Sequence, residues 1–146
     1  MNTSLSGPIR AAAGAWTEEE LRQIPLHGFQ KAIGIVLDEV TSQRITAHIL
    51  ITDAHRNSVG TVHGGVLMAL ADCLGGIGAL QSLQPGQRTA TLESKTNFIG
   101  SDAGDELHGE CTPIHLGSRT SVWTTRVTGE KGKLLSITTQ TQIHLV

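Results

Sequence analysis

The apolar residues of this chain are most densely grouped between Asn57 and Leu83, in the stretch NSVGTVHGGVLMALADCLGGIGALQSL. Its length and its few polar positions predict a single long helix that begins near His63. One acid, Asp72, lies in the middle of this apolar run. A carboxylate among apolar side chains is unfavourable unless it is paired or has a function, so Asp72 is the first candidate for a functional residue.

Shorter segments on both sides of this helix alternate apolar with polar residues and predict strands. They cover residues 31–40 and 44–52 before the helix, and residues 88–99, 105–115, 118–128 and 133–145 after it. Short glycine-bearing separators divide the later strands, so the last three are expected to form an antiparallel meander. One helix cannot cover six strands laid flat. The pattern therefore predicts an α+β fold in which a curved antiparallel sheet wraps around one long central helix.

The segment before the first strand is expected to add one short helix. Thr17 and Glu20 have the spacing of a capping box, and Pro25 ends the helix that this box begins. The residues before Thr17 are small and polar. We expect an N-terminal segment with a short capping helix over residues 1–28, and one folded domain over residues 29–146.

Composition narrows the possible partners. The 146 residues carry a formal net charge of −2 and include two Trp, two Phe and no Tyr. The chain therefore lacks both the positive charge of a nucleic-acid or membrane binder and the aromatic side chains on which bases stack. The N-terminus has no apolar core of signal-peptide length, and no run of about 18 apolar residues suggests a membrane span. We expect a cytoplasmic protein with no nucleic-acid partner and no membrane partner.

The sequence also lacks patterns that hold cofactors. Cys73 and Cys111 form no Cys-x-x-Cys pair and are expected to be small buried hydrophobes in a reducing compartment. Seven histidines are present, but His48, His55 and His63 have no recognisable ligand spacing. The glycines within residues 75–78 lie inside the predicted helix and lack the dinucleotide-binding spacing. No metal and no redox cofactor are expected.

Small residues surround Asp72 on the predicted helix. By the i, i+3, i+4 rule it shares a face with Gly65, Met68 and Gly76. The glycines within residues 75–78 each cost about 1 kcal/mol relative to alanine, so a second helix or a ligand is expected to press against this face. Asp72 is then either a base or nucleophile in a small-residue groove, or a buried acid that caps a neighbouring polar group.

The helix start is a second candidate site. The first backbone N–H groups of a helix lack intrahelical partners and lie at the positive end of its dipole. Glycine at positions 64 and 65 lets another group approach this backbone closely. The His63-Gly64-Gly65 step therefore either polarises a carbonyl group or only makes the turn into the helix.

The spacing of these two candidate sites indicates how they act together. Gly64 and Asp72 are eight residues apart, which is about 12 Å along a helix, so one chain cannot bring both to one reacting carbon. Two helices packed antiparallel across a two-fold axis would bring Asp72 of one chain near Gly64 of the other. Asn57 would arrive with the partner's Gly64. There it either hydrogen-bonds a water or a carbonyl, or is an ordinary turn residue.

Residues 57–72 resemble the signature of the hotdog-fold acyl-CoA thioesterases, in particular the PaaI-like and 4-hydroxybenzoyl-CoA thioesterase-type branches. The shared features are an Asn or Gln, then His-Gly-Gly, then an acid eight residues after the first glycine. The strand layout is similar over roughly residues 30–145. The resemblance implies a hotdog thioesterase domain over residues 29–146 and a homodimer, with dimers that pair into a tetramer.

The resemblance also implies roles for individual residues. Asp72 falls on the catalytic carboxylate, which acts as general base or as nucleophile. Gly64 falls on the position whose N–H polarises the thioester carbonyl, Asn57 on the residue that orients the water or the carbonyl, and His63 on the flanking histidine. Gly76 corresponds to a threonine of the 4-hydroxybenzoyl enzyme, so any role of that hydroxyl is missing here.

Coenzyme A would add phosphate groups at the mouth of the site, where arginine is a suitable ligand. The substrate-binding residues expected are Gly65, Met68, Gly76, Arg88 and Arg119, with Lys95 and Arg126 as further candidates. The alternative for each cation is a solvated charge on a strand.

The main hypothesis is hydrolysis of an aryl- or medium-chain acyl-CoA to the free acid and CoA, with Asp72 and the partner's Gly64 at one site. A second is a dimer that binds acyl-CoA as a sensor or carrier without turnover. A third is a structural dimer in which Asp72 only caps a neighbour.

Overall fold

The computed structural model describes residues 16–101 and 103–146, so most of the polar stretch expected at the N-terminus lies outside the described residues. The elements in chain order are α1 (Glu18–Arg22), α2 (Gly28–Ala32), β1 (Val36–Val40), β2 (Ile45–Leu50), the 3₁₀ helix η1 (Asp53–His55), α3 (Gly64–Leu80), β3 (Arg88–Phe98), β4 (Glu106–Leu116), β5 (Thr120–Gly129) and β6 (Leu134–Leu145). In these described ranges, no helix is long and apolar enough to cross a membrane.

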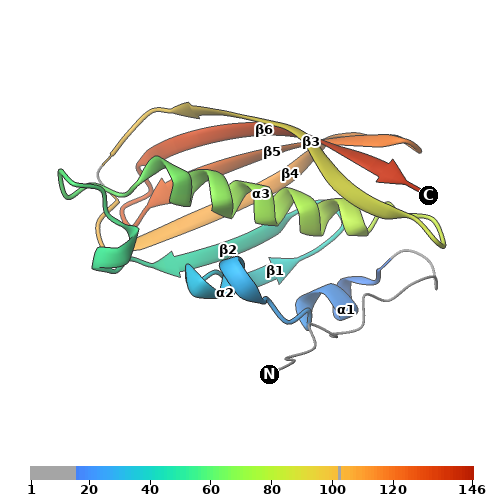
Figure 1. The fold of residues 1–146 in the computed structure, drawn as a ribbon, viewed down its shortest axis with the longest axis horizontal. Helices are drawn as coiled ribbons and strands as arrows, with labels where there is room; N and C mark the ends of the chain where they lie inside the picture. Colours follow the sequence, from blue (N-terminus) through green and yellow to red (C-terminus); the bar gives the residue numbers. More distant parts are fainter. Residues whose placement is uncertain (1–15, 102) are drawn as a thin grey trace, which may run out of the picture.

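The six strands form one sheet in the order β1-β2-β4-β5-β6-β3, and every neighbouring pair is antiparallel. Figure 1 shows α3 lying across one face of this curved sheet, with α1 and α2 beside β1. The expected α+β hotdog architecture is confirmed, and so is the meander of β4, β5 and β6. The chain places β3 at the far edge beside β6, because α3 carries the chain across the sheet between β2 and β3.

The N-terminal capping box is also confirmed. The Thr17 side-chain oxygen accepts a hydrogen bond from the Glu20 N–H at 3.2 Å, and the Glu20 carboxylate accepts one from the Thr17 N–H at 2.9 Å. Helix α1 ends before Pro25, as expected. Leu21 is fully buried, so α1 is packed against the rest of the protein through this residue.

The prediction of a first strand over residues 31–40 is wrong at its start. Residues Gly28–Ala32 form α2, and the Ile35 N–H still bonds back to the Gln30 carbonyl at 3.2 Å. Gly34 has a φ of 74°, a left-handed conformation that glycine adopts without strain. The chain therefore turns at this glycine, and β1 begins only after it.

Two of the three glycines in the second half of α3 face the sheet, which corrects the expectation that they form a surface for a partner. A Cβ added at Gly75 would overlap the Gln140 side chain, and one at Gly78 would lie 2.7 Å from the Trp123 ring. At Gly76 an added Cβ would meet no atom within 4 Å. The low helix propensity of Gly75 and Gly78 is therefore offset within the chain, because these glycines let α3 pack closely on β5 and β6.

Alanine substitutions at adjacent glycines test this assignment of faces. Gly75→Ala forces a methyl group into the Gln140 side chain, so we expect the free energy of unfolding to fall by about 1–3 kcal/mol. Gly76→Ala raises helix propensity in open space, so we expect an increase of up to about 1 kcal/mol. Urea denaturation followed by circular dichroism measures both. Equal effects at the two positions would contradict the assignment.

Candidate active site

Within the part of the chain that the structure describes, one backbone N–H group at the start of α3 has no hydrogen-bond partner. His63 is the N-cap residue, and its Nδ1 accepts a hydrogen bond from the Gly65 N–H at 2.9 Å. The Val66 N–H donates to the His63 carbonyl, also at 2.9 Å. Between them, the Gly64 N–H has no acceptor among the described residues. It lies at the positive end of the helix dipole and is available to a carbonyl oxygen of a ligand.

Two side chains lie close to the glycines of this turn. A Cβ added at Gly64 would lie 2.9 Å from Cε1 of Phe98, at the end of β3, and Phe98 is exposed enough to shift. One added at Gly65 would lie 3.0 Å from the capping Nδ1 of His63. Glycine at both positions therefore lets Phe98 and His63 lie close to the start of the helix.

The carboxylate of Asp72 lies on the exposed side of α3, so of the two alternatives the buried acid is not what one chain contains. The Thr91 hydroxyl of β3 donates a hydrogen bond to Asp72 Oδ1 at 2.8 Å. The main-chain carbonyl of Asp72 accepts a bond from Gln140 Nε2 at 3.5 Å. One carboxylate oxygen is thus oriented by β3, and the group remains open to a ligand.

A buried glutamine sets the direction of the Thr91 hydrogen bond. Gln142 of β6 is almost fully buried, and its Nε2 donates to the Thr91 hydroxyl oxygen at 2.7 Å. Its Oε1 accepts from the Thr89 hydroxyl at 2.9 Å. Because the amide nitrogen can only donate, the Thr91 proton is directed to Asp72. The sequence analysis missed Thr89, Thr91 and Gln142. Their only sequence signal is the alternation of Thr and Gln on two strands whose pairing was unknown.

The structure does not bring Gly64 and Asp72 together in one chain. Helix α3 is continuous from Gly64 to Leu80, so their separation of eight residues corresponds to about 12 Å along its axis. The unpartnered N–H and the oriented carboxylate therefore belong to two separate places on one rigid helix.

Asn57 shapes the loop that leads into α3. Its Oδ1 accepts hydrogen bonds from the N–H groups of Val59 and Thr61, each at 3.1 Å. Its Nδ2 donates to the Thr61 hydroxyl oxygen at 2.8 Å. One Nδ2 hydrogen is left for a water or a substrate. The geometry therefore favours the turn-building role of Asn57.

A pocket of about 300 Å³ lies beside Asp72. Its floor is the outer side of α3 from Asp72 to Leu80. Its walls are the start of β3, Gln142 of β6, and the segment that joins α1 to α2. Of the expected substrate-binding residues on the helix, Gly76 lines this pocket, whereas Gly65 and Met68 lie nearer the helix start and outside it.

Cys73 also lines the pocket but is not a competing nucleophile. Burial, together with the negative charge of Asp72, raises the pKa of the Cys73 thiol to about 12. The thiol therefore stays protonated at neutral pH, and the thiolate is the reactive form. Cys111 is also buried and free, as expected, and burial raises its pKa to about 12. Throughout residues 16–101 and 103–146, no three His, Cys, Asp or Glu side chains are grouped to hold a metal ion.

Arg88 and Arg119 lie on either side of the end of β6. Arg88 begins β3 opposite Leu145, and the Arg119 carbonyl accepts a hydrogen bond from the His144 N–H at 2.9 Å. Both arginines are exposed. Neither arginine lines the pocket beside Asp72, although Thr89, the residue after Arg88, does.

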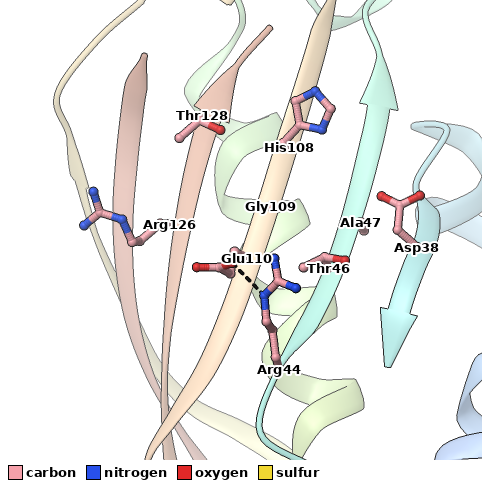
Figure 2. A pocket seen from close by; sticks show the side chains of 9 residues that line it. All are labelled: Asp38, Arg44, Thr46, Ala47, His108, Gly109, Glu110, Arg126 and Thr128. Carbon is pink, nitrogen blue, oxygen red and sulfur yellow. Dashed lines mark hydrogen bonds and ion pairs between the residues drawn. The ribbon is translucent and has the colours of Figure 1, made fainter. Parts of the chain in front are cut away.

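Another concavity, of about 340 Å³, lies on the face of the sheet opposite α3 (Figure 2). Arg44 donates to Glu110 at 2.7 Å and also pairs with Glu39. The hydrogen bond and charge of Glu110, with the charge of Glu39, raise the pKa of Arg44. Arg126 of β5 lines this concavity (Figure 2). The sheet lies between this face and Asp72, so Arg126 and Asp72 of one chain line different pockets.

Comparison with known proteins identifies the family. The model of the thioesterase superfamily matches residues 59–136, more than half of the chain. A 1,4-dihydroxy-2-naphthoyl-CoA hydrolase of Listeria monocytogenes is 32% identical over 110 residues, which cover 75% of this chain and 89% of that protein. The chain belongs to the thioesterase superfamily.

Solved structures agree with the fold. A thioesterase of Haemophilus influenzae superposes with a TM-score of 0.80 at 24% identity, over 92% of this chain and 94% of that one. The E. coli PaaI protein superposes with a TM-score of 0.73 at 21% identity, over 80% of this chain and 83% of that one. The fold is the hotdog fold of PaaI-like thioesterases, and with the family match the protein is a thioester hydrolase.

Two substitutions at Thr91 test whether its hydroxyl orients Asp72. Thr91→Val keeps the shape of the side chain but removes the hydrogen bond, so we expect kcat on an accepted thioester to fall about tenfold or more, with a smaller change in KM. Thr91→Ser keeps the donor and is expected to retain most of the activity. Steady-state kinetics of both variants measure this. Equal losses in the two variants would contradict an orienting role.

Proposed function

We propose that the protein hydrolyses an aryl- or medium-chain acyl-CoA to the free acid and CoA. The observation that carries this proposal is the exposed carboxylate of Asp72, held by Thr91 at the end of a ligand-sized pocket. An acid so placed can remove a proton from water or attack a carbonyl carbon. The named CoA-thioester substrate of the Listeria relative supports the choice of CoA as the thiol.

Each site combines two chains. The Gly64 N–H of one chain binds the thioester carbonyl oxygen, and Asp72 of the other chain acts on the carbonyl carbon or on the attacking water. The separation of about 12 Å along one helix supports this arrangement, because both groups must reach one carbonyl. A two-fold axis with antiparallel helices provides two identical sites from two chains.

The edge strand β3 supports dimer formation. It has 11 residues, borders the sheet, and is exposed over most of its length. Two of its large apolar side chains, Leu92 and Phe98, are 60% and 55% exposed. Long edge strands with exposed apolar residues are templates for pairing with another chain. Antiparallel pairing of two β3 strands puts the Thr91 end of one beside the Phe98 end of the other. Asp72 of one chain then approaches Gly64 of its partner, and such dimers pair further into a tetramer.

The reaction follows from these positions. As the water oxygen, or the Asp72 carboxylate itself, bonds to the carbonyl carbon, negative charge develops on the carbonyl oxygen. The preorganised Gly64 N–H stabilises this charge. In the water route, Asp72 takes a proton from the water as its oxygen bonds to the carbon. The carbon–sulfur bond then breaks, the thiolate of CoA leaves, and the proton on Asp72 passes to the thiolate or to solvent. In the direct attack, water subsequently hydrolyses the acyl group from Asp72.

Other residues position the reacting groups. His63 holds the Gly65 N–H, and Asn57 holds the loop before the helix, so together they fix the direction of the Gly64 N–H. Arg88 and Arg119, outside the pocket, bind CoA phosphates by charge-assisted hydrogen bonds.

A panel of acyl-CoA substrates with a coloured-thiol assay tests the proposal. We expect the wild type to hydrolyse several of them, and Asp72→Asn and Asp72→Ala to lose about 10²–10⁴-fold in kcat. Asp53→Asn alters another exposed acid and serves as the matched control, with no expected loss.

Three results would count against this proposal. Undiminished turnover in both Asp72 variants would contradict a catalytic role of Asp72. Tight binding of acyl-CoA by the wild type without hydrolysis would indicate a sensor or carrier instead. A lower melting temperature in Asp72→Ala, with no affinity for CoA esters in the wild type, would indicate a structural role.

A further inference from the structure

The pocket beside Asp72 has one wall that comes from the N-terminal part of the chain. Ile24, Pro25 and Leu26 form this wall, together with Gln30 of α2. The superfamily model matches residues 59–136, so these residues are not part of the matched region. The family match therefore assigns no role to this wall.

We propose that the Ile24–Leu26 wall closes the far end of the acyl pocket and limits the size of the acyl group. This inference rests on the proposed function, because it takes the thioester carbonyl to lie at Asp72. An acyl chain extending from there runs along α3 towards Leu80, which is eight residues and about 12 Å from Asp72. Ile24 and Leu80 line the same pocket, so the wall and the end of this path border one cavity.

The wall is anchored to the rest of the protein. Ile24 and Leu26 pack against the hydrophobic core, and the neighbouring Leu21 is fully buried. The Trp16 N–H donates to the Leu80 carbonyl at 3.4 Å, at the far end of α3. A wall held at both the core and the helix end can exclude a ligand by its size.

Gly76 provides the second observation. Its two neighbouring helix glycines are explained by close packing on the sheet, but a Cβ at Gly76 would meet no atom within 4 Å. Glycine at this position costs about 1 kcal/mol in helix propensity with no packing gain in the chain. The open space at Gly76 is the floor of the pocket, one helical turn beyond Asp72. The missing side chain makes room there for an acyl group.

The volume indicates which acyl groups fit. About 300 Å³ is at the lower end of the range for small-molecule pockets. Its lining includes four large apolar residues, two from the wall and two from the helix: Ile24, Leu26, Ile77 and Leu80. The pocket therefore accepts a medium straight chain or a single aromatic ring, and it rejects long-chain acyl groups.

Binding of S-alkyl-CoA thioethers, which cannot be hydrolysed, tests the wall separately from the chemistry. We measure affinities for the ethyl, octyl and dodecyl thioethers, and for the benzyl thioether, by calorimetry. Gly76→Val fills the floor, so octyl affinity is expected to fall at least about fivefold relative to ethyl. Leu26→Ala opens the wall, so dodecyl affinity is expected to rise at least about fivefold relative to octyl.

Phe29→Ala is the matched control. Phe29 is a large apolar residue near the same wall, but it is 67% exposed and does not line the pocket. For the Phe29→Ala variant, the octyl-to-ethyl and dodecyl-to-octyl affinity ratios are expected to equal those of the wild type. Melting temperatures of the three variants establish that each is folded under the conditions of the binding experiment.

The outcomes separate the two proposals. A lower octyl-to-ethyl affinity ratio in Gly76→Val and a higher dodecyl-to-octyl ratio in Leu26→Ala, with unchanged ratios in Phe29→Ala, support the wall. If the wild type then hydrolyses no acyl-CoA, only the proposed reaction fails. If the wild type hydrolyses acyl-CoA but the affinity ratios of Gly76→Val and Leu26→Ala equal those of the wild type, the wall is overturned and the proposed reaction is supported. Equal shifts in all three variants, or no affinity of the wild type for any thioether, also overturn the wall.

Discussion

The close packing of α3 on the sheet is the constraint on which the rest of the structure depends. At Gly75 and Gly78 the helix lies so near β6 and β5 that a single added carbon would collide with Gln140 or Trp123. This contact fixes the rotation of the helix about its axis. Asp72 and Gly76 are consequently directed outward, towards β3 and the N-terminal segment. The pocket and the position of the acid both follow from the packing of neighbouring glycines.

The same rigid helix separates the two groups that the proposed reaction uses. The unpartnered N–H is at the positive end of the helix dipole, where it best stabilises an oxyanion, and the acid is two turns further on. Neither can move towards the other without unwinding α3. In the proposed enzyme each helix therefore serves two sites, and activity is linked to association of the chains. The edge strand that orients Asp72 through Thr91 is also the strand available for pairing.

Local patterns in the sequence predicted the architecture and the central candidates. Alternating strands and one long apolar run gave the curved sheet and its helix, and the His63-Gly64-Gly65 step gave the helix start. Contacts between distant segments could not be predicted in this way. The pairing of β3 with β6 places Gln142 beside Thr91, and only the register of that pair reveals it. Likewise, the glycines near Asp72 look alike in sequence, and the rotation of α3 decides which of them packs and which lines the pocket.

A mixed-dimer experiment tests the shared site most directly. Gly64→Pro removes the backbone N–H at a helix position that tolerates proline, and Asp72→Asn removes the acid. The two variants are inactive alone in this account. Dimers formed from an equal mixture are predicted to recover about one quarter of wild-type turnover, because half are mixed and each mixed dimer has one intact site. A mixture that forms mixed dimers but stays inactive would contradict a site built from two chains.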